Sequence, residues 1–187
     1  MLRTLSTFAA FGTISFAGMN SASATPITID GRTGATFGVS LGGGHIGCAD
    51  DGCEDLTGSG SFSLHGGGIV GGRVAVLGDL WWMVHEDDDL SVNQGLLTGN
   101  VRVWPLSGLW LQGGLGLARL GVRYDPGVVA YESRSEWVPA FQLGVGVEPI
   151  ATDTFGLDIH LKYGTGFYSE GEDRIHNVSL NLGLSFY

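Results

Sequence analysis

The chain has 187 residues, and its 19 acidic and 9 basic side chains give a formal net charge of −10. Such an acidic surface repels phosphate, so we expect no nucleic-acid partner. Glycine accounts for 33 residues, far above the usual ~7%, but the glycines follow no three-residue period and 43% of the residues are hydrophobic, which excludes both a collagen-like and a disordered chain.

The first 24 residues have the pattern of a secretory signal peptide. Arg3 precedes a largely apolar stretch over residues 8–18, and Ala22-Ser23-Ala24 matches an A-x-A cleavage site. The stretch is too short, and too interrupted by Gly, Thr and Ser, for a membrane-spanning helix. We therefore expect cleavage after Ala24 and one mature domain over residues 25–187.

The two cysteines lie close together in an acidic segment, CADDGCEDL. An exported protein folds in an oxidising compartment, so Cys48 and Cys53 are predicted to form a local disulfide. The alternative, a zinc site, needs two more cysteine or histidine ligands nearby.

Apolar and polar residues alternate with a period of two along most of the mature chain, and no segment keeps a helical period. The expected strands, in chain order, cover residues 36–44, 61–70, 74–85, 96–105, 109–120, 139–149, 155–164 and 176–187. The first two are glycine-rich and weak, and in the third only Asp79 marks an inward face. In the last, Val178 and Leu180 fall on one face, and Ser179 and Asn181 fall on the other.

The connections between these strands are of two kinds. Turns near residues 71–73, 105–108 and 149–153 are short, whereas those around residues 45–60, 86–93, 123–134 and 169–175 are mostly longer and hold most of the acidic residues. Short turns at one end and longer polar loops at the other are typical of an outer-membrane barrel.

The two faces of the expected strands differ in chemistry. One face is aliphatic and aromatic over about 9–11 residues, the length that a tilted strand needs to cross a bilayer. The other face carries glycines and charges of both signs, which can pair inside the narrow lumen of an eight-stranded barrel. The predicted polar network of the lumen consists of Asp79, Arg102, Glu148, Asp158, His160 and Lys162. We interpret it as a plug of paired charges, with a proton or ion path as the alternative; a soluble lipocalin-like barrel is the alternative fold.

Aromatic residues near the predicted strand ends are expected to form girdles at the two membrane interfaces. They are Trp81, Trp82, Trp104, Trp110, Trp137, Tyr163, Phe167, Phe186 and Tyr187. Trp81 and Trp82 are adjacent, so one should face lipid and the other the lumen.

The signal peptide, the eight alternating strands and the terminal strand VSLNLGLSFY resemble the small outer-membrane β-barrels of Gram-negative bacteria, the OmpA/OmpX-like and opacity-protein-like group. The resemblance implies an all-β protein, an eight-stranded antiparallel up-and-down transmembrane β-barrel in the outer membrane. It implies outer-membrane lipids as surroundings, and periplasmic chaperones and the barrel-assembly machinery as partners during biogenesis. It implies no cofactor, and we expect no peptidoglycan-binding domain after the barrel.

Barrels of this group typically end in an aromatic residue that the assembly machinery reads. Here the alternation places Phe186 on the lipid side and Tyr187 last, a slight departure from a terminal phenylalanine. Phe186 and Tyr187 are therefore the expected assembly signal.

Sequence motifs for enzymatic activity lack the structural context that they need. GGGHIG and GGGIVG match G-x-G-x-x-G, but no helix follows either one, so nucleotide binding is not expected. His176 and Ser179, with Glu170 or Glu172, could serve a lipid A deacylase or acyltransferase. However, residues three apart on a strand point to opposite faces, so the histidine and the serine should not meet.

Two acidic segments are candidates for calcium binding, because calcium takes several carboxylate oxygens. Their residues are Asp50, Asp51, Glu54 and Asp55 in the first, and Glu86, Asp87, Asp88 and Asp89 in the second. Neither has the ligand spacing of a known calcium loop, and we favour solvated extracellular loops that contact a partner. The predicted function is a non-enzymatic, structural or surface-interaction role; a lipid-modifying enzyme and a narrow ion channel are the alternatives.

Overall fold

The computed structural model describes residues 32–48, 56–87, 89–127, 131–168 and 175–187, without the side chains of residues 48, 56 and 57. The predicted signal peptide and the Cys48–Cys53 disulfide lie outside this description, and both stay predictions. Five of the acidic calcium candidates also lie outside it, namely Asp50, Asp51, Glu54, Asp55 and Asp88.

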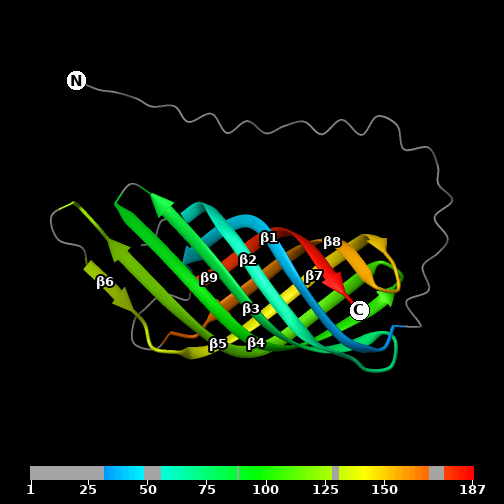
Figure 1. The fold of residues 1–187 in the computed structure, drawn as a ribbon. Coiled ribbons are helices and arrows are strands. Elements are labelled where there is room, and N and C mark those ends of the chain that lie inside the picture. Colours follow the sequence, from blue (N-terminus) through cyan, green and yellow to red (C-terminus); the bar gives the residue numbers. More distant parts are fainter. Residues whose placement is uncertain (1–31, 49–55, 88, 128–130, 169–174) are drawn as a thin grey trace, which may run out of the picture.

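Nine β-strands make up most of the described part of the chain, and Figure 1 shows them wound around a common axis. They are β1 Gly34–Cys48, β2 Leu56–Ile69, β3 Val74–Asp87, β4 Leu90–Leu106, β5 Leu109–Tyr124, β6 Tyr131–Arg134, β7 Val138–Ala151, β8 Phe155–Gly166 and β9 Ile175–Phe186. The described ranges contain no helix that is both long and apolar enough to span a membrane.

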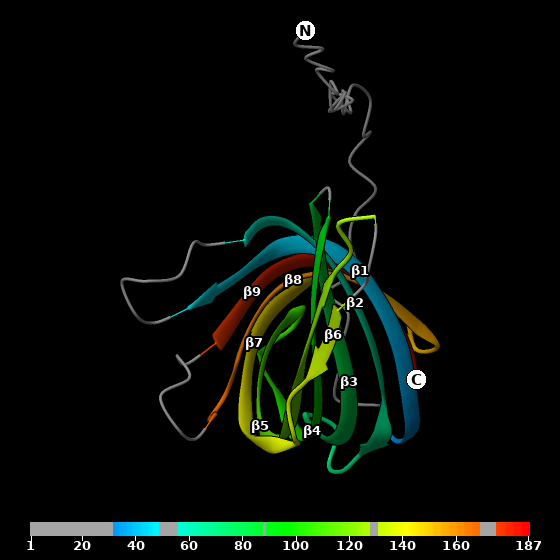
Figure 2. The same cartoon turned by 90° about the vertical axis from the view of Figure 1, so that its left-hand side faces the viewer.

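Eight of these strands form a closed antiparallel ring. Strands β1 to β5 pair in chain order, β5 pairs with β7, β7 to β9 pair in order, and β9 returns to β1. Figure 2, seen from the loop end, shows the strands curving around the central axis. Short β6 stands apart and pairs with the loop end of β5. Closure satisfies the backbone groups of every ring strand, and the predicted eight-stranded antiparallel up-and-down barrel is confirmed.

The strands at the loop end run further than the sequence suggested. Asp87 pairs with Leu90 across a tight β3–β4 hairpin, so the predicted long loop over residues 86–93 is wrong. The acidic residues after His85 favour a loop locally. However, Leu90 and Val92 continue the alternation and pack into the lumen, so the pairing of β3 with β4 extends to the hairpin. The predicted loop over residues 123–134 likewise contains the unexpected strand β6.

The barrel wall is apolar outside and polar inside. On β9, Leu180 and Leu182 are each 60% exposed, whereas Asn181 between them is 2% exposed. The same alternation continues around the ring, so large aliphatic side chains cover the outside while charged and amide side chains are buried in the lumen. A water-soluble barrel has the opposite arrangement, because its apolar residues form the core.

Three tryptophans lie inside the lumen instead of in an outer girdle. Trp81, Trp104 and Trp110 are at most 2% exposed. The girdle prediction is wrong for these three, because each occupies an inward position of its strand, where indole rings fill the space beside small residues. Trp82 and Trp137 are exposed on the outside, as expected.

Candidate functional site in the barrel lumen

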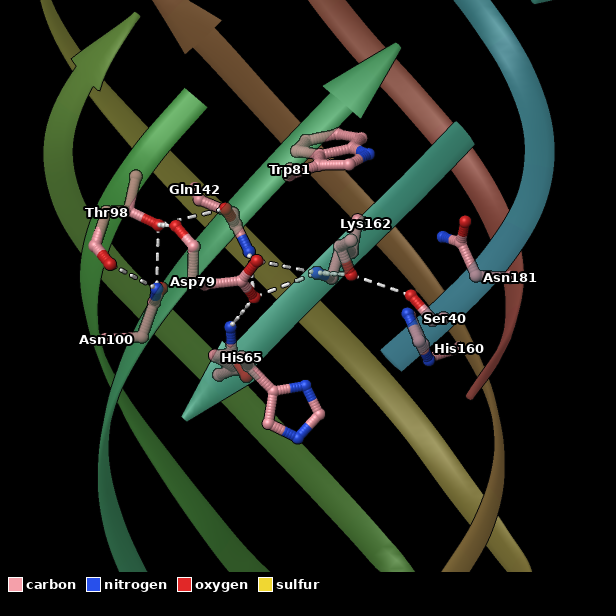
Figure 3. A network of polar contacts seen from close by, with 12 residues as sticks. Ser40, His65, Asp79, Trp81, Thr98, Asn100, Gln142, His160, Lys162 and Asn181 are labelled. Atoms are coloured by element: carbon pink, nitrogen blue, oxygen red, sulfur yellow. Dashed lines mark hydrogen bonds and ion pairs between the residues drawn. The ribbon is translucent and has the colours of Figure 1, made fainter. Parts of the chain in front are cut away.

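A buried ion pair lies at the centre of the lumen. Lys162 on β8 points across the barrel to Asp79 on β3, and its Nζ lies 2.8 Å from Oδ2 and 3.2 Å from Oδ1 (Figure 3). Lys162 also donates to the Ser63 hydroxyl at 2.8 Å. Both charged side chains are at most 1% exposed. A charge this deeply buried is stable only when an opposite charge and hydrogen bonds satisfy it.

Amide side chains complete the surroundings of Asp79. Gln112 and Gln142 each donate from Nε2 to Oδ2 of this carboxylate at 3.1 Å. The Gln112 oxygen accepts from Nε of Arg102 at 2.9 Å. The Gln142 oxygen accepts from the Thr98 hydroxyl at 3.0 Å. Arg102 therefore reaches the carboxylate through an intervening amide.

A second charged group surrounds Glu148 at the end where the short turns lie. Arg32 Nη1 lies 3.0 Å from Oε2, while Trp104 Nε1 and the Tyr187 hydroxyl donate to Oε1 at 2.9 and 3.0 Å. The Arg32 guanidinium also lies 3.8 Å from the centre of the Tyr187 ring. Burial and the neighbouring Glu148 carboxylate raise the pKa of Tyr187, so its hydroxyl stays protonated and able to donate.

A third group joins Asp158 and His160, which hydrogen-bond each other on the lumen face of β8. The Trp110 ring lies 5.3 Å from the His160 ring. The Arg102 guanidinium lies 4.2 Å from the centre of the same Trp110 ring. The Trp110 ring therefore lies between His160 and Arg102 and fills the space that separates them.

Apolar side chains close the lumen on both sides of the central ion pair. Along the lumen face of β3, Leu77 and Trp81 flank Asp79. The cluster on the loop side consists of Ile46, Trp81, Met83, Val92, Leu96, Ala118 and Ala140. The cluster on the short-turn side consists of Ile69, Ala75, Leu77, Trp104 and Trp110. The ion pair therefore lies between two apolar layers of the lumen.

The structure buries all six residues of the predicted network, but it divides them into the three groups described above. Sequence reasoning missed Gln112 and Gln142, although both occupy inward positions of the alternation and could have been found there. It also missed Arg32, which precedes β1 and belongs to no repeating pattern. The role of the network stays a prediction.

The two last residues face different surroundings. Phe186 lies on the outer face and stacks on Phe37, with ring centres 5.0 Å apart. Tyr187 turns into the lumen towards Glu148, so it belongs to the plug and not to an outer girdle. The role of both residues as an assembly signal stays a prediction.

The acidic residues of the β3–β4 hairpin lie exposed at the loop end. Glu86, Asp87 and Asp89 line a shallow pocket of about 430 Å³ with Arg123 and Asp125. Arg123 pairs with Asp125 at 3.2 Å. Across the described ranges, no three potential metal-ligating side chains gather closely enough to hold an ion. Solvated acidic segments stay the prediction, with calcium binding as the less favoured alternative.

The candidate catalytic pair is separated by the strand wall. Ser179 is 1% exposed and faces the lumen, whereas His176 faces outward, where its ring stacks on that of Tyr163. Glu170 and Glu172 lie outside the described residues. The histidine and the serine therefore cannot share a proton in this barrel.

Comparison with protein-family models gave no match, and neither did comparison with curated proteins. Among solved structures, Ail, the attachment invasion locus protein of Yersinia pestis, is similar with a TM-score of 0.63 and 14% identity, over 83% of this chain and 99% of that chain. Neisserial surface protein A (NspA) is similar with a TM-score of 0.60 and 13% identity, over 81% and 96%. Ail in complex with the heparin analogue sucrose octasulfate gives a TM-score of 0.55 and 12% identity, over 83% and 99%. At identities this low, the structural similarity shows the fold alone. The predicted resemblance to small eight-stranded outer-membrane barrels is confirmed.

Proposed function

We propose that the protein is an outer-membrane barrel with a sealed lumen and a non-enzymatic role, structural or in surface interaction. The observation that supports this best is the arrangement of the wall, with exposed aliphatic side chains outside and ionised side chains inside. Soluble monomers rarely expose a contiguous apolar patch larger than a few hundred Å². A bilayer removes the cost of that exposure, and the closed ring leaves no backbone group unsatisfied in lipid.

The order of the layers inside the barrel supports a sealed lumen. The Asp79–Lys162 pair lies between two apolar clusters that contain three buried indole rings. An ion entering the lumen would have to displace these side chains and compete with an ion pair that is already satisfied. This favours a structural plug.

A narrow proton or ion path is the second candidate. Several buried polar atoms on β8 and β9 have no hydrogen-bond partner among the described residues, and they include His160 Nε2, Asn181 Oδ1 and both amide atoms of Asn177. Such groups are usually hydrated. A hydrated row along these two strands could carry protons even where larger ions cannot pass.

The surface-interaction part of the proposal concerns the loop end. The sequence places its acidic segments there, at residues 45–60 and 86–93. The similar protein Ail is named for attachment and invasion, and this supports a contact role for the loop end of the present barrel. No part of the proposal requires a catalytic residue, and a lipid-release assay on the purified barrel tests for hidden lipid-modifying activity.

Fractionation, gel migration and conductance test this proposal together. We expect the protein in the outer-membrane fraction, with heat-modifiable migration and with its loops cut by protease on intact cells. In planar bilayers we expect no large, stable conductance. A monomer that stays soluble without detergent would contradict the membrane location, and a stable conductance would contradict the sealed lumen alone.

A further inference from the structure

A pocket of about 290 Å³ lies on the outer wall of the barrel near the loop end, over β3, β4, β5 and β6. Its lining includes Trp82, Asn93, Arg119, Arg134 and Trp137. The strand register places Trp82, Asn93, Arg119 and Arg134 on the outward face, because directly paired residues of neighbouring strands share a face. Trp137 lies between β6 and β7 and is 50% exposed. This pocket therefore faces whatever surrounds the barrel and is separate from the lumen.

Two glycines pair with residues of the pocket lining, and one of them, Gly121, itself lines the pocket. Gly95 lies between Trp82 and Arg119 in the register, and a Cβ at this position would lie 2.8 Å from Cζ3 of the Trp82 ring. Gly121 lies between Asn93 and Arg134, and a Cβ there would lie 2.9 Å from the Asn93 side-chain oxygen. A side chain at Gly95 would collide with the Trp82 ring, and one at Gly121 would collide with the Asn93 side chain, so both glycines allow these lining residues to keep their positions.

Arg119 has hydrogen-bonding capacity to spare. Its Nε donates to the Ser135 carbonyl oxygen at 3.1 Å, and its guanidinium lies 6.0 Å from the Trp137 ring centre. Its two terminal amino groups have no hydrogen-bond acceptor among the described residues. A guanidinium anchored through Nε presents these two donors as a fork, which matches two oxygens of a phosphate.

Arg134 can add a second cation at the same place. Its side chain is 61% exposed, and its ion-pair partner Glu132 is 54% exposed. Exposed pairs of this kind contribute about 0–1 kcal/mol, so a phosphate can replace the carboxylate at little cost. Arg119 and Arg134 therefore bring two guanidinium groups to the lining of one pocket.

The positions of the other cations show that this site is not part of a generally basic surface. Arg32, Arg102 and Lys162 are buried in the lumen. Arg73 lies at the opposite end, in the short turn before β3. The remaining cations of the described ranges, Arg119, Arg123 and Arg134, all belong to β5 and β6 (Figure 1).

The height of the pocket on the wall matches a lipid headgroup. Leu117 is the last exposed aliphatic residue on β5, and Arg119 is the next residue on the same face. Trp82 and Trp137, 42% and 50% exposed, flank the pocket, as tryptophans do at the boundary between acyl chains and headgroups. We propose that this pocket binds the phosphate group of an outer-leaflet glycolipid, with the acyl chains against the aliphatic wall below. This inference rests on the proposed outer-membrane location.

Lipid binding by the full-length barrel in detergent tests the inference. Wild type, Arg119→Gln/Arg134→Gln and the control Arg73→Gln are titrated with bisphosphorylated lipid A, with dephosphorylated lipid A and with inorganic phosphate, and bound lipid is counted by native mass spectrometry. We expect saturable binding of the phosphorylated lipid to wild type and to the control. Removing two arginines that lie near a charged lipid surface should weaken binding by about thirtyfold.

Each outcome has a defined meaning. Equal binding to wild type and the double variant overturns the site, and so does equal weakening in Arg73→Gln, because net charge alone would then explain the effect. Binding of dephosphorylated lipid as tight as that of phosphorylated lipid overturns the role of the phosphate. Strong binding of inorganic phosphate alone overturns the assignment to a lipid. Heat-modifiable migration is recorded for every variant; a wild type that does not fold in detergent contradicts the proposed location and not the pocket.

Discussion

The two faces of β5 carry different side chains, because one face lies on the outside of the barrel and the other lines the lumen. Leu115 and Leu117 are exposed on the outer face and lead to Arg119, whereas Trp110 and Gln112 are buried on the lumen face. A cation lies near an indole ring on each side of the wall. Inside, Arg102 of the neighbouring strand β4 lies 4.2 Å from the Trp110 ring centre; outside, Arg119 lies 6.0 Å from the Trp137 ring centre.

The difference lies in how fully these cations are partnered. The lumen cations Lys162 and Arg102 donate to side chains that are themselves hydrogen-bonded, so each is part of a buried network. Arg119 on the outer wall keeps two donor groups without an acceptor among the described residues, so it can bind a ligand. The face of the strand, and not the residue type, decides the role. Substitutions on the lumen face should therefore cost stability, while matched substitutions outside should cost little.

The largest effect is expected from Lys162→Met. The variant leaves the Asp79 carboxylate buried without its cation, and breaking a buried pair on one side costs about 3–5 kcal/mol. The free energy of unfolding is measured by urea titration in detergent, with heat-modifiable migration as a second readout. The lumen should stay closed, because the two apolar layers remain, and bilayer recordings should show no new conductance.

The double variant Lys162→Met/Asp79→Leu is the matched control. It removes both charges, and apolar replacement of a buried pair is often neutral or stabilising. We therefore expect it to recover most of the lost stability. If the double variant is as unstable as the single one, the lost packing of Lys162 and not the orphaned charge explains the result.

A pair of glycines on β5 should separate the two faces next. A Cβ at Gly116, on the lumen face, would lie 2.0 Å from the Leu97 carbonyl oxygen, whereas a Cβ at Gly113, on the outer face, meets nothing closer than Leu143 Cδ2 at 3.5 Å. Overpacking predicts a loss of about 1–3 kcal/mol for Gly116→Ala. Gly113→Ala should change the free energy of unfolding by less than about 1 kcal/mol. Equal losses in both variants would mean that strand flexibility, and not the close approach of the neighbouring backbone at Gly116, explains why glycine is needed here.

The sequence was sufficient for the architecture because alternation is a local property. Each residue of β9, for example Asn181 between Leu180 and Leu182, reports its own face, and eight such segments with a signal peptide permit few folds. Aromatic residues misled the same reasoning at Trp104 and Trp110. Tryptophan as a residue type suggests a membrane interface, but both residues occupy inward positions in the alternation of their strands. The position in the alternation decides which face a side chain lies on.

The partners within the lumen could not be predicted in the same way. Whether Lys162 meets Asp79 or Asp158 depends on the stagger between strands that are distant in the sequence, and alternation contains no information about stagger. Arg32 lies before β1, so no period marks it, and it enters the network only because the closed ring brings it beside Glu148.

The smallest effect is expected from Tyr187→Phe, which removes the hydrogen bond to Glu148. At pH 8 the variant should be about 1–2 kcal/mol less stable, since Glu148 keeps two other partners. The pKa of Tyr187 is raised in the folded state, so folding holds its proton more tightly than the unfolded chain does. The stabilisation is therefore complete below the unfolded pKa of about 10 and is lost as the pH rises above it. Urea titrations at pH 8 and pH 11 should show that the difference in the free energy of unfolding between wild type and variant is smaller at pH 11.

The exposed Tyr131→Phe is the control, and it should leave the free energy of unfolding unchanged within about 0.5 kcal/mol at pH 8. If the difference between wild type and Tyr187→Phe is the same at both pH values, the packing of the Tyr187 ring against Arg32, and not its hydroxyl, stabilises the terminus.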